Sequence, residues 1–435
     1  MTKWKETEIG KIPEDWDICK LGDYLIIKGR IGWKGLKKSE FSEVGECMII
    51  NGPNIKDGKI DFNECMRIPK WRYDESPEIM LKQKDILMTK DGTIGKTAYV
   101  DYLPKPASVA SGIFVIRNNS KELNQKYLYF VLTSQYFKNL IISRTEGSVI
   151  PHLYQRDITE LKIPLPSLIE QDKIAKILSD LDSKIELNNQ MNATLEAMAQ
   201  AIFKHWFIDF EFPDENGKPY KSSGGELVDS ELGKIPEGWK IRTVKDLGRV
   251  ICGKTPPTKN KENYGGDTPF ITIPDMHGNT YIIKTERYLS EIGASTQQKK
   301  EIPPSSVCVS CIATPGIVVL TSERSHTNQQ INSIIPTKDI GPYYVYLTMK
   351  DKSKEIKQMG LGGTTTLNLN TGDFERIKII IPTESVLLKF NTLVKSIFEQ
   401  LLSNSRQNST LQNSRESLLP KLMSGKIRVQ MVVSK

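Results

Sequence analysis

The chain carries one sequence motif twice. Residues 9–16 read IGKIPEDW and residues 232–239 read LGKIPEGW, an offset of 223 residues. A second related pair, GSVIPHLYQRD at 147–157 and GTTTLNLNTGD at 363–373, is offset by 216 residues, and each member precedes an apolar stretch that ends in proline. Two motifs that recur at nearly constant offset, far apart within each copy, indicate that a whole domain and its trailing element are duplicated.

The length and composition fit two globular domains. A chain of 435 residues is too long for a single hydrophobic core, and its 38% apolar and 26% charged residues are typical of globular proteins. No stretch approaches the roughly 18 uninterrupted apolar residues that a membrane helix needs. The first ten residues, MTKWKETEIG, lack the apolar core of a signal peptide, so we expect a cytoplasmic protein.

The six cysteines are too sparse for a disulfide framework. Only Cys308 and Cys311 have CxxC spacing, whereas zinc usually takes four ligands and the chain offers no second cysteine pair and only four histidines. A buried strand with small apolar thiols explains VCVSCIA better than a metal or redox site, and no metal site is predicted.

Each copy predicts a mixed α/β domain. A short helix-like stretch after the tryptophan is followed by β-rich runs broken by glycine, proline and aspartate, up to about residues 150 and 368. Residues 126–141 and 342–359 each read as one helix.

A long helix without proline or glycine is predicted from Glu170 to about Phe210, roughly 60 Å at 1.5 Å per residue. Its apolar and small residues recur at alternating spacings of four and three, and this spacing is typical of the seam of a heptad coiled coil. Adding 216 to each position gives the same pattern in the second copy. The first seam is Ile174, Leu178, Leu181, Ile185, Asn188, Asn192 and Leu195, and the second is Phe390, Val394, Ile397, Leu401, Asn404, Asn408 and Leu411.

Two asparagines lie on each seam. Polar residues at heptad core positions lower stability but fix register and partner choice, so we expect Asn188 and Asn192 to meet Asn404 and Asn408. Two matched seams favour an intramolecular coiled coil over the alternative, a long amphipathic helix in a globular core. The predicted fold class is mixed α/β: two globular domains separated by two long antiparallel coiled-coil helices, with internal two-fold pseudosymmetry.

The predicted domain limits follow from these patterns. They are a first domain at 1–160, a central helical spacer at 161–212, a polar linker at 213–228, a second domain at 229–376 and a C-terminal helical spacer at 377–435.

A basic loop punctuated by glycine or proline follows the tryptophan in each copy. Glycines let backbone approach a phosphate chain, and cations displace its counterions; the alternative is an ordinary solvated face. The net charge of +8 also favours a polyanionic partner. The candidate nucleic-acid contacts are Lys28, Arg30, Lys34, Lys37 and Lys38 in the first copy and Lys254, Lys259 and Lys261 in the second.

No sequence motif for catalysis is found. GTIGKT at 92–97 lacks the first glycine of a phosphate loop and fits a turn between strands, and Asp214 to Lys218 (DENGK) lies in the linker. No nucleophile elbow, HExxH motif or glycine-rich cofactor loop occurs. We therefore predict no catalytic residue.

Several motifs in order along the whole chain resemble the specificity subunit of type I restriction and modification systems. They are IGKIPEDW and LGKIPEGW, KIPLPSLIEQDKIAKIL, WFIDFEFPDENGKPYKSSGGE, and LLPKLMSGKI. The resemblance is strongest in the helical regions and weakest in the two globular domains.

The resemblance implies a DNA-binding subunit without catalytic activity. Each globular domain would be a target recognition domain that reads one half of a bipartite, asymmetric sequence in double-stranded DNA. The helices would fix the gap and dock two modification (methyltransferase) subunits and, through them, restriction subunits. S-adenosylmethionine, ATP and Mg would then belong to those partner subunits, with no cofactor in this chain and no membrane association.

Further residues are weaker candidates for reading bases. Asparagine and glutamine can pair with adenine, which points to Asn328 and Gln329. His152, Tyr154, Gln155 and Arg156, with Asn368 and Asn370 in the second copy, fit DNA contact and turn or capping chemistry equally well.

Two other functions stay open at this point. One is a single-chain methyltransferase or nuclease with diverged motifs. The other is a coiled-coil scaffold protein whose basic loops are incidental.

Overall fold

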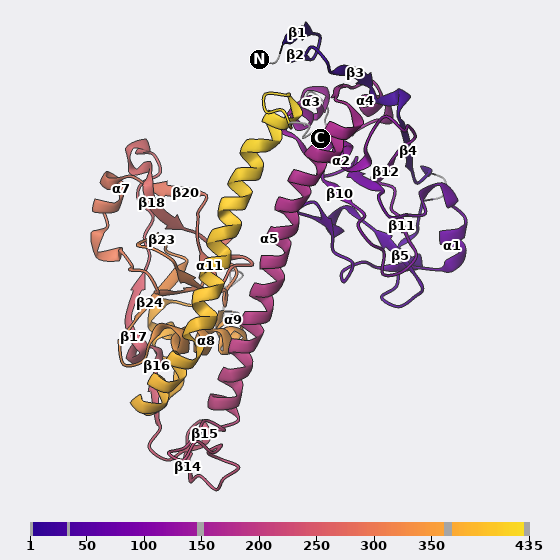
Figure 1. Ribbon diagram of the computed structural model, residues 1–435. Helices are drawn as coiled ribbons and strands as arrows, with labels where there is room; N and C mark the ends of the chain where they lie inside the picture. The colour runs from indigo at the N-terminus through magenta and orange to yellow at the C-terminus, as the bar shows by residue number, and fades with distance from the viewer. Residues whose placement is uncertain (1–2, 33–34, 146–151, 361–367, 430–435) are drawn as a thin grey trace, which may run out of the picture. The chain divides into compact units, whose positions relative to one another are not determined.

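The computed structural model describes residues 3–32, 35–145, 152–360 and 368–429 and divides into two compact units. One unit comprises residues 1–183 and 412–435, and the other comprises 184–411 (Figure 1). Each long helix therefore contributes a segment to both units.

The first unit is built on a four-stranded antiparallel sheet in the order β10-β9-β12-β4. A three-stranded sheet, β11-β5-β8, lies against one face of it. The bounds are β4 Leu25–Gly29, β5 Cys47–Ile50, β8 Arg67–Ile68, β9 Ile86–Thr89, β10 Thr97–Tyr99, β11 Ala107–Val109 and β12 Ile113–Asn118. Small hairpins pair β1 Trp4–Thr7 with β2 Gly10–Pro13 and β6 Ile55–Lys56 with β7 Lys59–Ile60, and β3 Asp17–Lys20 pairs with β13 Lys162–Leu165.

Successive side chains along β9 and β12 point to opposite faces of the sheet, so the core of the first unit has two layers. Ile86, Met88 and Ile116 pack with Phe130 of helix α2 (Gln125–Thr133), whereas Leu87 and Val115 pack with the three-stranded sheet. The remaining helices are α1 Lys70–Asp74, α3 Gln135–Thr145 and α4 Gln155–Thr159.

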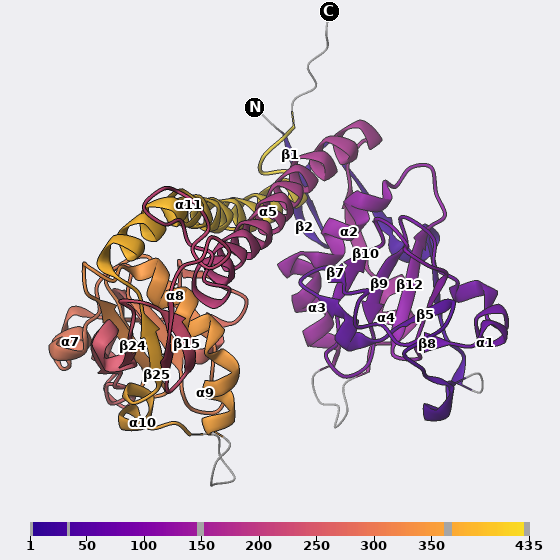
Figure 2. The ribbon, with the colours of Figure 1, turned by 90° about the horizontal axis from the view of Figure 1, so that it is seen from below.

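The second unit repeats this plan (Figure 2). Its main sheet runs β17-β24-β21-β22-β19, and its smaller sheet runs β20-β18-β23. The strand bounds are β14 Leu227–Ser230, β15 Gly233–Pro236, β16 Lys240–Thr243, β17 Gly248–Cys252, β18 Tyr264–Ile271, β19 Tyr281–Ile282, β20 Arg287–Leu289, β21 Val307–Ser310, β22 Val318–Thr321, β23 His326–Thr327, β24 Ile331–Pro336 and β25 Lys378–Ile381. The helices are α6 Ile273–Met276, α7 Glu291–Ser295, α8 Pro342–Asp351, α9 Ser353–Gly360 and α10 Thr371–Glu375.

The CxxC pair lies in this second core. Cys308 is fully buried in β21, and burial raises the pKa of its thiol to about 12. Cys311 follows the strand and is also buried. The interpretation of VCVSCIA as a buried strand is confirmed.

Two local predictions are wrong. The stretch after each tryptophan is a strand, β3 or β16, followed by a short 3-10 turn, because β3 pairs with β13 and β16 pairs with β25. Each helix predicted between the sheet and the seam is two helices, since Ser134 has an extended backbone (φ −68°, ψ 155°) and α8 ends before Lys352. In the first unit the Ser134 hydroxyl then accepts a hydrogen bond from Phe137 N (3.3 Å) and starts α3.

Most of the segment predicted as a polar linker, 213–228, forms hydrogen-bonded turns. Asp214 Oδ1 accepts from the backbone N–H groups of Asn216 and Lys218, each at 2.8 Å. The Tyr220 ring stacks on Phe212 with centroids 4.6 Å apart. Asp214 thus serves turn chemistry.

The repeated residues GKIP form the second strand of a hairpin in each copy, where β1 pairs with β2 and β14 pairs with β15. Gly10 (φ +100°) and Gly233 (φ +94°) occupy the turns, where an L side chain would be strained. The tryptophan that follows is buried against the end of a long helix. Trp16 packs with Leu422 and Met423, and the Trp239 ring lies 5.8 Å from that of Phe207.

The long helices are α5 Leu168–Phe203 and α11 Glu384–Met423 (Figure 1). Within each unit they pair in opposite directions. In the second unit Asn188 Nδ2 donates to Asn408 Oδ1 (2.9 Å) and Asn404 Nδ2 donates to Asn192 Oδ1 (2.9 Å). In the first unit Arg415 forms an ion pair with Asp182 at 2.6 Å. All fourteen predicted seam residues are buried or half-buried.

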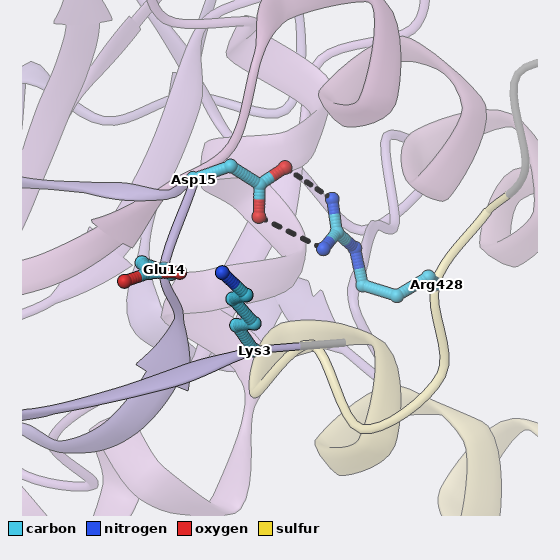
Figure 3. A pocket seen from close by; sticks show the side chains of 4 residues that line it. All are labelled: Lys3, Glu14, Asp15 and Arg428. Atoms are coloured by element: carbon cyan, nitrogen blue, oxygen red, sulfur yellow. Dashed lines mark hydrogen bonds and ion pairs between the residues drawn. The ribbon is translucent and has the colours of Figure 1, made fainter. Parts of the chain in front are cut away.

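The segment after α11 is fixed to the first domain. Arg428 donates from Nη1 and Nη2 to the two Asp15 oxygens (2.9 and 2.7 Å), and from Nε to Glu170 Oε1 (2.8 Å). Trp16 Nε1 donates to Glu170 Oε2 (2.9 Å), so one buried carboxylate joins the repeat motif, α5 and the tail. Figure 3 shows the Arg428 guanidinium facing the Asp15 carboxylate. Both residues, with Lys3 and Glu14, line a shallow hollow of about 310 Å³.

Candidate nucleic-acid interface

In each unit, several candidate segments follow strands that end at the same edge of the main sheet. In the first unit, β4 ends at Gly29 opposite Phe114, and β9 ends at Thr89 opposite Ile113. The loop after β4 and the turn after β9 therefore leave the sheet at the same edge, which we call the loop edge. In the second unit, Cys252 of β17 lies opposite Asn332, and Ser310 of β21 lies opposite Ile331, which gives the equivalent loop edge.

The first basic loop presents exposed lysines on an anchored backbone. Lys28 lies on the exposed side of β4, and Lys37 and Lys38 are exposed beyond it; Lys34 lies outside the described residues. Arg72 of α1 holds this loop, since it donates to Glu40 from Nε (2.7 Å) and Nη2 (2.9 Å) and to Gly35 O (3.2 Å). The same guanidinium lowers the pKa of the Glu40 carboxyl. Arg72 thus fixes where Lys37 and Lys38 stand.

Arg30 differs from the other basic candidates because its side chain is only 3% exposed. Its Nε donates to Val109 O (3.1 Å) and its Nη2 donates to Ser108 Oγ (3.1 Å), so it joins β4 to β11 of the smaller sheet. Burial lowers the pKa of this guanidinium. In this conformation Arg30 stabilises the domain and does not reach a phosphate on the surface, which corrects its place among the candidate contacts.

The second basic loop is tied to the polar run before β24. Lys254, Lys259 and Lys261 are exposed. The Thr255 hydroxyl donates to Gln329 Oε1 (2.6 Å), and Lys254 N donates to Thr327 O (2.9 Å). The sequence indicates Lys254 and Gln329 separately, and the structure brings their segments together at the loop edge.

Asn328 is largely buried and used internally. Its Nδ2 donates to Gln330 Oε1 (2.9 Å) and its Oδ1 accepts from Gln330 N (3.0 Å). This arrangement shapes the turn before β24, so Asn328 does not present its amide to a base, whereas Gln329 is exposed.

The segments before α4 and α10 reach the same edge. Asp91 bridges to His152 in the first unit, and Ile312 bridges to Asn368 in the second. Leu153 N donates to Lys90 O and Leu369 N donates to Cys311 O, both at 2.9 Å. The backbone arrangement is therefore the same in both units.

The side chains on these two segments differ. In the first unit the His152 and Tyr154 rings meet edge to face at 4.6 Å, and the Arg156 guanidinium lies 5.1 Å from the Tyr154 ring centroid. In the second unit the Asn370 side chain caps α10 by accepting from Asp373 N (2.9 Å). The capping interpretation is confirmed for Asn370.

Two positioning residues had no signal in the sequence. Arg72 meets Glu40 from 32 residues away, and Asp91 contacts His152 from 61 residues away. Only the tertiary fold brings such pairs together, so local pattern could not find them.

Some apolar side chains on α5 face solvent. Leu187, Met191 and Met198 are 50%, 38% and 49% exposed, and they lie beside the buried seam rather than on it. A shallow hollow of about 290 Å³ is lined by Gln190, Met191, Thr194 and Leu195. A helix flank with exposed methionines is suited to contact with another protein.

Within the described ranges no group of three or more His, Cys, Asp or Glu side chains is arranged to hold a metal ion. Over the same residues, no helix is both long and apolar enough to span a bilayer.

Comparison with known proteins identifies relatives along the whole chain. A family model described as the type I restriction modification DNA specificity domain matches residues 13–197 and 236–408. The type I restriction enzyme HindI specificity subunit of Haemophilus influenzae is 36% identical over 95% of this chain and 100% of its own length. The type I restriction enzyme MjaIX specificity subunit of Methanocaldococcus jannaschii is 28% identical over 99% of this chain and 97% of its own.

A solved structure shows the same fold. The type I restriction-modification system S subunit from M. genitalium superposes with a TM-score of 0.55 at 18% identity, covering 96% of this chain and 97% of that one.

Proposed function

The chain belongs to the type I restriction-modification DNA specificity family, and from that membership we propose that it reads the DNA target of such a complex. The observation that carries the proposal is the pair of equivalent loop edges, each with exposed lysines on an anchored loop. Each domain reads one half of a bipartite target in double-stranded DNA. The two domains share one fold but present different surfaces, as the recognition of two different DNA half-sites requires.

The chain works without an active site of its own. Methyl transfer from S-adenosylmethionine belongs to two modification subunits, and cleavage with ATP and Mg belongs to restriction subunits that bind through them. The chain acts in the cytoplasm, where it meets cellular DNA. The target recognition domains are 1–160 and 229–376, and the helical spacers are 161–212 and 377–435.

We place a modification subunit on the exposed flank of α5 formed by Leu187, Met191 and Met198. These side chains leave apolar surface in water, and covering it with a partner helix is favourable. Methionine adapts to the partner's shape at little cost.

The function is tested by co-expressing the chain with its cognate modification subunit in a methylation-free host and sequencing the methylated bases. We expect one bipartite, asymmetric motif. Methylation by the purified chain alone would indicate an enzyme instead. Failure to bind any duplex even with the modification subunit would indicate a scaffold.

The role of the first basic loop is tested by the double substitution Lys37→Gln and Lys38→Gln. We expect weaker DNA binding and a flatter salt dependence, by about 0.9 in the log-log slope for each phosphate that is no longer neutralised. Lys121→Gln is a matched control, because this exposed lysine follows the opposite end of β12. A slope equal to that of the unmodified protein removes Lys37 and Lys38 from the interface.

A further inference from the structure

The two domains keep one backbone arrangement at the loop edge and differ in the side chains that it presents. The bridges Asp91 to His152 and Ile312 to Asn368 are equivalent, and each precedes a short helix, α4 or α10. At an offset of 216, His152, Tyr154, Gln155 and Arg156 correspond to Asn368, Asn370, Thr371 and Gly372. Two readers of different sequences must differ at the positions that face the bases, and these positions differ in every side chain.

In the first domain these side chains form an ordered stack. The Asp91 carboxylate bonds to His152 Nδ1, and the His152 ring meets the Tyr154 ring edge to face at 4.6 Å. Tyr154 N donates to Asp157 Oδ2 (2.8 Å), which fixes the backbone under the tyrosine. The Arg156 guanidinium lies 5.1 Å from the centroid of the Tyr154 ring. These successive contacts, from Asp91 through His152 and Tyr154, therefore set the direction of the Arg156 guanidinium.

The end of this stack faces solvent. Tyr154 is 53% exposed, and Gln155 and Arg156 are exposed as well. Burial of a solvent-facing tyrosine and arginine against a partner is typical of recognition surfaces. An arginine held against an aromatic ring keeps its fork of N–H donors free and loses less conformational entropy on binding than a mobile one.

We propose that Arg156 is a specificity-determining residue for the half-site read by the first domain, and that its partner is the base edge of a guanine in duplex DNA. Guanine offers two acceptors, O6 and N7, whose spacing matches the guanidinium fork. Tyr154, His152 and Asp91 are positioning residues that hold Arg156 toward the base. This inference rests on the proposed function and extends it to a particular residue.

The second domain reads its half-site without a stacked arginine of this kind. Gly372 stands in place of Arg156, and Asn370 in place of Tyr154 is engaged in capping α10. There the exposed Gln329, whose oxygen accepts from Thr255, lies at the same edge. The two domains thus present different chemistry from one scaffold.

The test uses the full chain assembled with its modification subunit and a library of duplexes with randomised positions. The bound sequences are determined for the unmodified chain and for Arg156→Ala. We expect Arg156→Ala to lose preference for one G·C pair by roughly 10- to 100-fold, the usual value of a bidentate base contact, with the other half-site unchanged. Arg156→Lys should restore only part of it, because an ammonium lacks the planar fork of donors that fits O6 and N7 together.

The positioning role has its own readout. Tyr154→Ala should weaken the preference at the same base pair, whereas Tyr154→Phe, which keeps the ring, should retain it. Lys121→Ala is the control for removal of a surface cation in the same domain. Thermal unfolding of each variant checks that the domain is intact.

The outcomes separate the inference from the function on which it rests. If the unmodified assembly selects no bipartite sequence, the proposed function fails. If it does, and Arg156→Ala selects the same sequence with the same preferences, Arg156 is not a specificity residue. A uniform decrease in affinity with unchanged preferences makes Arg156 a phosphate contact and overturns the proposal too.

Discussion

Arg428 joins three elements that are far apart in the sequence. It pairs with Asp15 in the repeat motif and with the buried Glu170 near the start of α5, and its guanidinium lies 5.6 Å from the Trp16 ring centroid. Without Arg428, the Glu170 carboxylate keeps the Trp16 indole as its remaining side-chain donor. A buried charge that loses its partner is costly, so this residue matters more than a surface arginine does.

Substituting Arg428→Ala should lower the free energy of unfolding of the first unit by about 1 to 3 kcal/mol, the usual cost of leaving a buried polar group without its hydrogen-bond partner. Urea unfolding followed by tryptophan fluorescence measures this, since Trp16 is in the same cluster. Arg406→Ala, an exposed arginine on α11, is the control and should change little. Equal midpoints for both variants would contradict a stabilising role for Arg428.

The same ion pair predicts a pH dependence. The hydrogen bond from Arg428 holds the pKa of Asp15 below its ordinary value of 3.8. A depressed carboxyl pKa contributes stability that is present above pH 3.8 and is lost as pH falls through the folded-state pKa. The stability difference between the unmodified chain and Arg428→Ala should therefore shrink as pH falls below 3.8. A difference that does not shrink at all as pH falls through the acid range below 3.8 would exclude this linkage.

The coiled coil carries a polar layer between apolar ends. Asn188 donates to Asn408 and to Gln407 (2.9 and 2.7 Å), and Asn408 donates to Asn189 (2.7 Å). Asn188 is fully buried, and its Oδ1 has no partner in the described part of the chain. Such a layer gives up stability for a single register.

Replacing both residues, Asn188→Leu with Asn408→Leu, should raise the unfolding free energy by about 1 kcal/mol or more and permit slipped pairings. The thermal midpoint reports the first effect, and the gap lengths among methylated targets report the second. Asn413→Leu on an exposed position of α11 controls for added apolar surface. A less stable variant with a single gap length would mean that the asparagines stabilise the pair rather than select its register.

Elements defined by periodicity could be predicted from the sequence, whereas those defined by a single residue could not. The heptad spacing predicts α5 and α11 because every third or fourth side chain must leave water. The break at Ser134 depends on one backbone conformation within an apolar run that reads as continuous. The strand β3 forms because β13, more than 140 residues later, pairs with it.

Much of the architecture could be predicted because the sequence contains it as a repeat, and the repeated motif marks the start of each copy. The candidate surface could be predicted only in part. Arg30 reads as a basic loop residue, yet its hydrogen bonds to Ser108 and Val109 place it inside the domain. The packing of the smaller sheet decides which charged side chains lie on the surface. A local sequence pattern does not predict that packing.

The length of the paired helices should set the distance between the two half-sites. One heptad inserted after Glu186 in α5, with a matched heptad after Ser409 in α11, keeps both seams in register and adds about 10.5 Å at 1.5 Å per residue. At about 3.4 Å per base pair this corresponds to about three base pairs. We expect the methylated motif to keep both half-sites and to gain about three base pairs in its gap. The same heptad in α5 alone misaligns the asparagine layer and should abolish methylation. An unchanged gap with the matched insertion would show that the helices do not measure the DNA.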